Sequence, residues 1–78
     1  MELKLSELQP GAKAKVQWFV GSGALQRRMM DMGLIPGTEI EVVRRALWGG
    51  PIQLRLKGYY LAMRRTECSH VIVERRVE

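Results

Sequence analysis

The sequence contains a single cysteine, Cys68, and a single histidine, His70. One cysteine excludes an intrachain disulfide framework and is typical of a reducing compartment. The two residues cannot complete the four ligands of structural zinc, or the two histidines and one carboxylate common at ferrous iron. No orienting carboxylate is evident beside them, which argues against a hydrolase triad. We expect no catalytic residue, no cofactor and no metal site; the one metal alternative is a site built by Glu67, Cys68 and His70, or shared between protomers.

Long apolar runs are also missing. No stretch approaches the roughly 20 residues of a membrane-spanning helix, and the opening MELKLSEL lacks the apolar segment of a signal peptide. The phosphate-loop pattern G-x-x-x-x-G-K-[ST] is absent, so any nucleotide chemistry would belong to a partner. We therefore expect a cytoplasmic chain that is not an enzyme.

Aromatic residues make up only 6% of the chain, and no predicted strand interleaves them with basic residues. Such interleaving is typical of surfaces that stack on nucleic-acid bases. The net charge of +5 is spread over separated arginine pairs, without a run long enough to mark a charged interaction tail. The basic surface is compatible with nucleic acid or anionic lipid as a partner. Because of the low aromatic content, nucleic acid is not favoured as a partner.

Hydrophobic residues, at 46% of 78 residues, suffice for one small core, so we predict a single domain over residues 1–78. The most informative segment of this domain predicts a short helix. Leu25, Met29 and Met32 are spaced so that they form one apolar stripe along a helix. Ser22 is placed to cap its first turn.

A fixed corner follows this helix. Gly33 suits the left-handed position after the last turn, and Leu34 can then pack back on Met29, as in a Schellman ending. Pro36 and Gly37 suit the two central positions of a type II turn. The sequence therefore predicts that the helix leads directly into a β-strand.

Alternating apolar residues and turn signals predict about five short strands, with the helix between the first two. Glycines and a proline after Trp48 indicate a hairpin, residues 66–69 indicate a tight turn, and residues 3–8 are interpreted as a lead-in. This pattern predicts a small closed or nearly closed β-barrel. The expected strands are Ala12–Val20, Thr38–Arg45, Ile52–Lys57, Tyr59–Arg64 and Val71–Val73.

Two details of these strands can be tested by a structure. In the first strand, Val16, Trp18 and Val20 are expected to face the core, with Phe19 on the outer face. In the second strand, Glu39 and Glu41 are expected to lie opposite lysine or arginine on the outer face.

Four residues are candidates for binding a protein partner. Arg27, Arg28 and Met30 share the helix side away from the apolar stripe, and Trp48 lies at the tip of a hairpin that we expect near this side. Aromatic and arginine residues are enriched at interface hot spots. Trp48 has two open roles, because a tryptophan on a turn can anchor a partner or fold over the end of the barrel.

Three segments in this order resemble the FeoA family, ferrous iron transport protein A. LSELQPG (Leu5 to Gly11) is similar to the family's opening, and MMDMGLIPGTEIEVV (Met29 to Val43) is similar to its central motif. GPIQLRLKGYYLAMRRTECSHVIVE (Gly50 to Glu74) is similar to its last strands. The resemblance implies an SH3-like barrel with an accessory role in bacterial ferrous iron uptake.

The implied partner is the FeoB permease, through its cytosolic G-domain region, so that the chain contacts the membrane only through this partner. Weak self-association is a further option. The same domain ends the DtxR-type iron-dependent repressors, which implies a regulatory or nucleic-acid-associated module as the alternative. Because Met1 opens the chain and no helix-turn-helix region or membrane segment precedes the domain, we expect the free-standing form.

Overall fold

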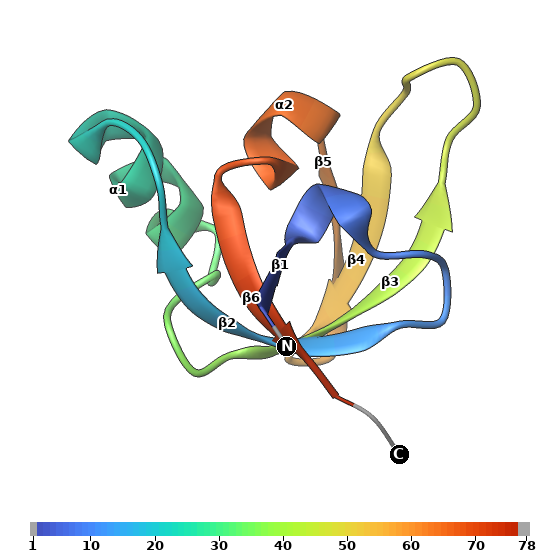
Figure 1. Cartoon of the computed structure of the whole chain (residues 1–78), viewed down its shortest axis with the longest axis horizontal. Helices are drawn as coiled ribbons and strands as arrows, with labels where there is room; N and C mark the ends of the chain where they lie inside the picture. Colours follow the sequence, from blue (N-terminus) through green and yellow to red (C-terminus); the bar gives the residue numbers. More distant parts are fainter. Residues whose placement is uncertain (1, 77–78) are drawn as a thin grey trace.

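Six antiparallel strands form one strongly bent sheet, with a helix beside one end and short helical turns over the core (Figure 1). The computed structural model describes residues 2–76. This arrangement confirms the predicted mainly β fold with one short helix between neighbouring strands. The elements are β1 (Glu2–Lys4), the 3-10 turn η1 (Leu5–Glu7), β2 (Lys13–Phe19), α1 (Gly23–Asp31), β3 (Glu39–Arg45), β4 (Ile52–Leu56), β5 (Tyr59–Met63), α2 (Arg65–Cys68) and β6 (Val71–Arg75).

The sheet follows the order β1-β6-β2-β3-β4-β5, so that β1 and β5 are its edge strands. The long strands β2 and β3 curve around the core, and η1 and α2 contact each other between the two edges (Figure 1). This contact covers apolar residues that a flat six-stranded sheet would leave exposed.

The core is built by residues that alternate along the strands. Ile52, Leu54 and Leu56 of β4 are buried, as are Ile40 and Val42 of β3. Their neighbours Gln53 and Arg55 point to the outer face, which is the alternation that the sequence predicted. Burying one such side chain contributes roughly 1.5–3 kcal/mol, so these strands hold much of the stability.

The helix and its ending are confirmed in detail. The Ser22 hydroxyl accepts a hydrogen bond from the Leu25 backbone N–H at 3.2 Å, which caps the first turn of α1. At the other end, Gly33 has a φ of +95° and the Leu34 N–H donates to the Met29 carbonyl at 3.1 Å. Together with the bond from the Gly33 N–H to Met30, this is a Schellman ending.

The turn after α1 is also confirmed. Gly37 has a φ of +94°, and the Thr38 N–H donates to the Ile35 carbonyl at 3.0 Å. The chain then enters β3, where Glu39 lies opposite Lys15 and Glu41 lies between Lys13 of β2 and Arg55 of β4. The predicted pairing of acids with bases across the outer face is therefore present.

The prediction for the end of the first strand is wrong. Trp18 and Val20 are about half exposed, and Phe19 packs against the core instead. A β-bulge between Val16 and Trp18 places an extra β2 residue against β6, and this shifts the alternation by one residue. Side chains beyond the bulge therefore exchange faces.

Two further elements differ from the prediction. The segment interpreted as a lead-in contains β1, which is a strand because it pairs with β6, for example at Leu3 and Val73. The expected tight turn near Thr66 is part of the short helix α2, whose Arg64 backbone N–H donates to the Glu67 carboxylate at 2.9 Å.

Candidate functional site

The outer side of α1 combines an exposed apolar residue with basic ones. Met29 of the same helix is fully buried, whereas Met30 is 46% exposed beside the exposed Arg27. Arg28 is partly engaged, because its guanidinium lies 2.9 Å from the Glu67 carboxylate of α2. Arg27 and Met30 therefore form the free part of this face, which we name the α1 surface.

Glu67 links α1 to α2. One carboxylate oxygen accepts the hydrogen bond from the Arg64 backbone, and the other faces Arg28. That second oxygen is buried and accepts no hydrogen bond, so the Arg28 contact is a charge attraction without aligned hydrogen-bond geometry. The pair leaves Arg28 less available than Arg27 for a partner.

Trp48 lies at the tip of the β3–β4 hairpin and is fully exposed. It does not fold over the end of the barrel, so that alternative is wrong. The expected position near α1 is also wrong, because the hairpin and α1 lie on opposite sides of the molecule (Figure 1). Any role of Trp48 in binding is therefore independent of the α1 surface.

Two arginines hold the base of this hairpin. Arg65 donates to the carbonyls of Ala46 and Gly50 at 3.1 and 3.3 Å. Arg45 donates to the carbonyls of Ser6 and Leu8, both at 2.7 Å. Sequence reasoning missed these roles, because the acceptors are backbone carbonyls that carry no signal in the residue types.

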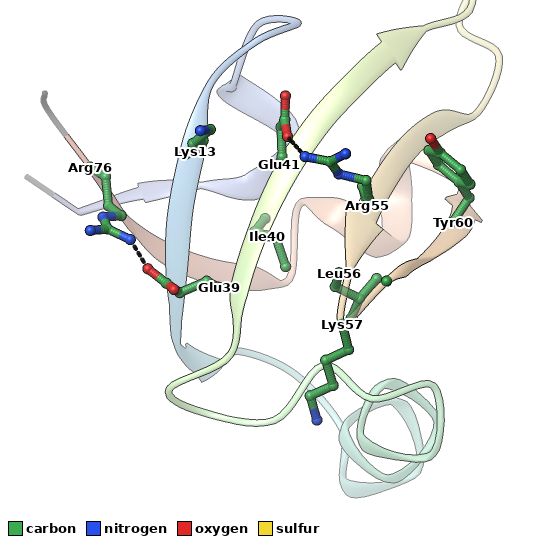
Figure 2. Close-up of a pocket in the computed structure, with 10 residues that line it drawn as sticks. Lys13, Glu39, Ile40, Glu41, Arg55, Leu56, Lys57, Tyr60 and Arg76 are labelled. Carbon is green, nitrogen blue, oxygen red and sulfur yellow. Dashed lines mark hydrogen bonds and ion pairs between the residues drawn. The ribbon is translucent and has the colours of Figure 1, made fainter.

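The outer face of the sheet has an open hollow of about 490 Å³ across β2, β3 and β4 (Figure 2). Its two acids are paired, Glu41 with Arg55 at 2.7 Å and Glu39 with Arg76. Lys13 also lines the hollow. Both acids of the lining are thus neutralised by arginines, and Lys13 and Lys57 add further positive charge. The alternation of acids and bases along these strands is the signal in the sequence that indicates this hollow.

The segment from Cys68 to His70 is organised for packing. Cys68 is fully buried, and burial, helped by the nearby Glu67 carboxylate, raises the pKa of its thiol to about 12. The His70 Nδ1–H donates to the Thr66 carbonyl at 2.8 Å, which fixes the orientation of the ring. Across residues 2–76, no group of three or more His, Cys, Asp or Glu side chains is placed to hold a metal ion.

The raised pKa of Cys68 predicts a loss of stability at alkaline pH. The unfolded thiol ionises near pH 9, whereas the folded thiol stays neutral until about pH 12. Its contribution is fully present below pH 9 and falls above it, by up to about 1.4 kcal/mol per pH unit. Denaturant melts of wild type and Cys68→Ala between pH 8 and 11 measure this difference. Equal pH slopes for the two proteins would contradict it.

No helix among residues 2–76 is long and apolar enough to cross a bilayer.

The chain forms a small SH3-like β-domain. This class is defined by the bent sheet and the corner after α1, and one helix and one hairpin of the domain carry exposed residues. A family model described as the FeoA domain matches residues 3–75. The chain belongs to the FeoA family.

A curated relative from Porphyromonas gingivalis (strain ATCC BAA-308 / W83) is described as an "Fe(2+) transport protein A/Fe(2+) transporter FeoB fusion protein". It is 32% identical to the chain over 72 residues, which are 92% of the chain but 8% of the fusion protein. The chain thus spans a small part of that relative.

Solved structures agree with the fold. A FeoA-like protein from Clostridium acetobutylicum is 39% identical, with a TM-score of 0.90 over 99% of this chain and 90% of that one. FeoA from Stenotrophomonas maltophilia, described as a prokaryotic SH3 domain protein complexed with zinc, is 26% identical, with a TM-score of 0.78 over 92% and 89%. A manganese-dependent transcriptional repressor has a TM-score of 0.85 over 94% of this chain and 41% of its own, but at 14% identity it shares only the fold.

Proposed function

We propose that the chain is a cytoplasmic, non-catalytic accessory protein of ferrous iron uptake, which binds the cytosolic region of a FeoB-type permease and modulates it. The observation that carries this proposal is the fusion protein, in which a segment 32% identical to this chain is part of one polypeptide with a FeoB transporter. Joining two domains covalently is useful when they act at the same place, because it raises their effective concentration.

The residues of the chain support a binding role over a chemical one. Its only thiol is buried with a raised pKa, and the only histidine is held by a backbone carbonyl. Nucleophilic catalysis needs an accessible, activated group beside a base. Ferrous iron in this proposal is the cargo of the permease.

The α1 surface is the docking site that we propose for the permease. Met30 is an exposed, adaptable apolar side chain, and Arg27 beside it carries a free charge. The outer hollow is less suitable, because its acids are already paired with Arg55 and Arg76. An acidic, partly apolar patch on the partner would complement the α1 surface.

Arg27→Glu is expected to weaken binding to the isolated cytosolic region of the permease by about fivefold at low salt, and by less at high salt, because an exposed rim charge is screened. Calorimetric titration at two salt concentrations measures this. Arg28 is left unchanged so that its pair with Glu67 survives. Arg75→Glu, an equal charge change on the exposed end of β6, is the matched control.

Met30→Ser is expected to weaken the same interaction by about tenfold at either salt concentration, because it removes apolar contact area. Equal affinities for wild type, Arg27→Glu and Met30→Ser would show that the permease does not dock on the α1 surface. No measurable binding of the wild type would contradict the proposed partner itself.

A further inference from the structure

A stretch of the chain that begins in β3 and includes the β3–β4 hairpin carries only basic charges. Residues 42–66 contain six basic residues and no acidic one, although the whole chain has a net charge of +5. The stretch covers most of β3, the hairpin, β4, β5 and the start of α2. Its basic residues are Arg44, Arg45, Arg55, Lys57, Arg64 and Arg65.

The tip of this hairpin departs from ordinary turn chemistry. Trp48 and Gly49 both have positive φ, at 62° and 76°, and the Gly50 N–H donates to the Leu47 carbonyl at 3.2 Å, as in a type I′ turn. Asn or Gly normally takes the position of Trp48, because a bulky side chain is strained there. Trp48 is also 100% exposed and Leu47 is 79% exposed. Both features cost free energy in the isolated protein.

The base of the hairpin is rigid and basic. Arg65 fixes the carbonyls on either side of the turn, and the Ala46 N–H donates to the Pro51 carbonyl at 3.0 Å. Arg44 is exposed on β3 just before the turn, and Arg64 is exposed just beyond Met63, which pairs with Ile52. At about 3.3 Å per strand residue, both arginines lie within roughly 10 Å of the turn along the chain direction.

We propose that this hairpin tip binds the surface of an anionic lipid bilayer: Trp48 and Leu47 enter the interface while Arg44 and Arg64 contact lipid phosphates. The proposal goes beyond the proposed function and does not rest on it. It also goes beyond the sequence prediction, in which the chain reaches a membrane only through its partner.

The shape and charge of the tip fit a bilayer better than a protein. The loop projects beyond the rest of the sheet (Figure 1), whereas an anchor on a protein needs a pocket that receives it. Tryptophan is favoured at membrane interfaces, where its ring is buried and its N–H stays hydrated. The exposed Arg44 and Arg64 near the tip complement an anionic leaflet, and one aliphatic and one aromatic side chain suit shallow insertion.

Vesicle binding by the purified chain tests the proposal without any permease. A Trp18→Phe protein leaves Trp48 as the single tryptophan, so that its fluorescence reports on the tip. We expect this protein to float with vesicles made of equal parts phosphatidylcholine and phosphatidylglycerol, but not with phosphatidylcholine alone. The emission of Trp48 should shift to the blue, and brominated lipid should quench it.

The Trp48→Asn variant distinguishes a loss of membrane insertion from a loss of folding. It should raise the melting temperature by about 4 °C, because it relieves the left-handed strain, and lower the vesicle partition coefficient by about tenfold or more. Arg44→Gln with Arg64→Gln should lower partitioning by about 30-fold at low salt. Lys15→Gln with Arg75→Gln, the same charge change far from the hairpin, should have a smaller effect.

Absence of binding to the anionic vesicles, or binding that Trp48→Asn leaves unchanged, would overturn the proposal. An equal loss of vesicle partitioning in the hairpin double variant and in the Lys15→Gln with Arg75→Gln control would also overturn it. The attraction to the vesicles would then come from the overall charge of the chain. A third outcome is that the wild type does not bind vesicles and that Trp48→Asn loses binding to the permease. This outcome would overturn the proposal and assign the hairpin tip to a protein partner.

Discussion

Gly33→Val is expected to lower the free energy of unfolding by about 3 kcal/mol or more. The residue has a φ of +95°, where a β-branched side chain is strongly disfavoured. A Cβ atom there would also overlap the Tyr59 hydroxyl, which donates a hydrogen bond to the Met32 carbonyl. The substitution thus strains the corner and displaces the side chain that ties it to β5. Urea melts of the variant and wild type measure the loss.

Alanine substitutions at two glycines distinguish backbone strain from steric crowding by a neighbouring side chain. Gly37 has nearly the same φ, +94°, but a Cβ there would meet nothing within 4 Å. Gly33→Ala should therefore cost clearly more than Gly37→Ala, and Tyr59→Phe should recover most of the difference by removing the clashing oxygen. Equal costs for the two alanine variants would mean that Tyr59 does not restrict the corner.

Arg45→Ala is expected to lower the free energy of unfolding by about 2 kcal/mol or more. The guanidinium donates to the Ser6 and Leu8 carbonyls, which lie some forty positions away in a half-buried region. Removing it leaves two acceptors without a partner and frees η1 from the hairpin base. Chemical denaturation measures the cost. The adjacent, exposed Arg44→Ala should change stability by less than about 0.5 kcal/mol, and a similar loss in both would contradict this role.

Features specified by neighbouring residues were predictable from sequence. The cap at Ser22, the ending at Gly33 and the turn at Pro36–Gly37 each need a residue type with a particular backbone or hydrogen-bonding property. The alternation in β4 was predictable for a similar reason, because one of its faces is buried along its whole length.

Features that depend on distant partners were not predictable. β1 is a strand through its pairing with β6, and three residues carry too little pattern to reveal it. The bulge after Val16 adds one residue to β2, and nothing in its residue types marks the change that exposes Trp18 and buries Phe19. A similar shift beyond Val42 accompanies the inward position of Arg45.

The candidate site was partly predictable. Helical spacing correctly separated the exposed Met30 from the buried Met29, and the hairpin turn correctly placed Trp48 at a tip. The sequence could not place the tip relative to α1, because that distance is set by the bending of the whole sheet (Figure 1). Nor could it show that Arg28 pairs with Glu67, since the pair joins two helices far apart in the chain.

We propose that the chain assists a FeoB-type permease and does not itself move iron. Uptake of radiolabelled Fe²⁺ tests it in cells that lack their own FeoA protein, with and without the permease. We predict that the chain raises uptake only when the permease is present, and that Arg27→Glu with Met30→Ser reduces this gain while Arg75→Glu does not. Uptake that rises without the permease, or fails to rise with it, would contradict an accessory role for the chain.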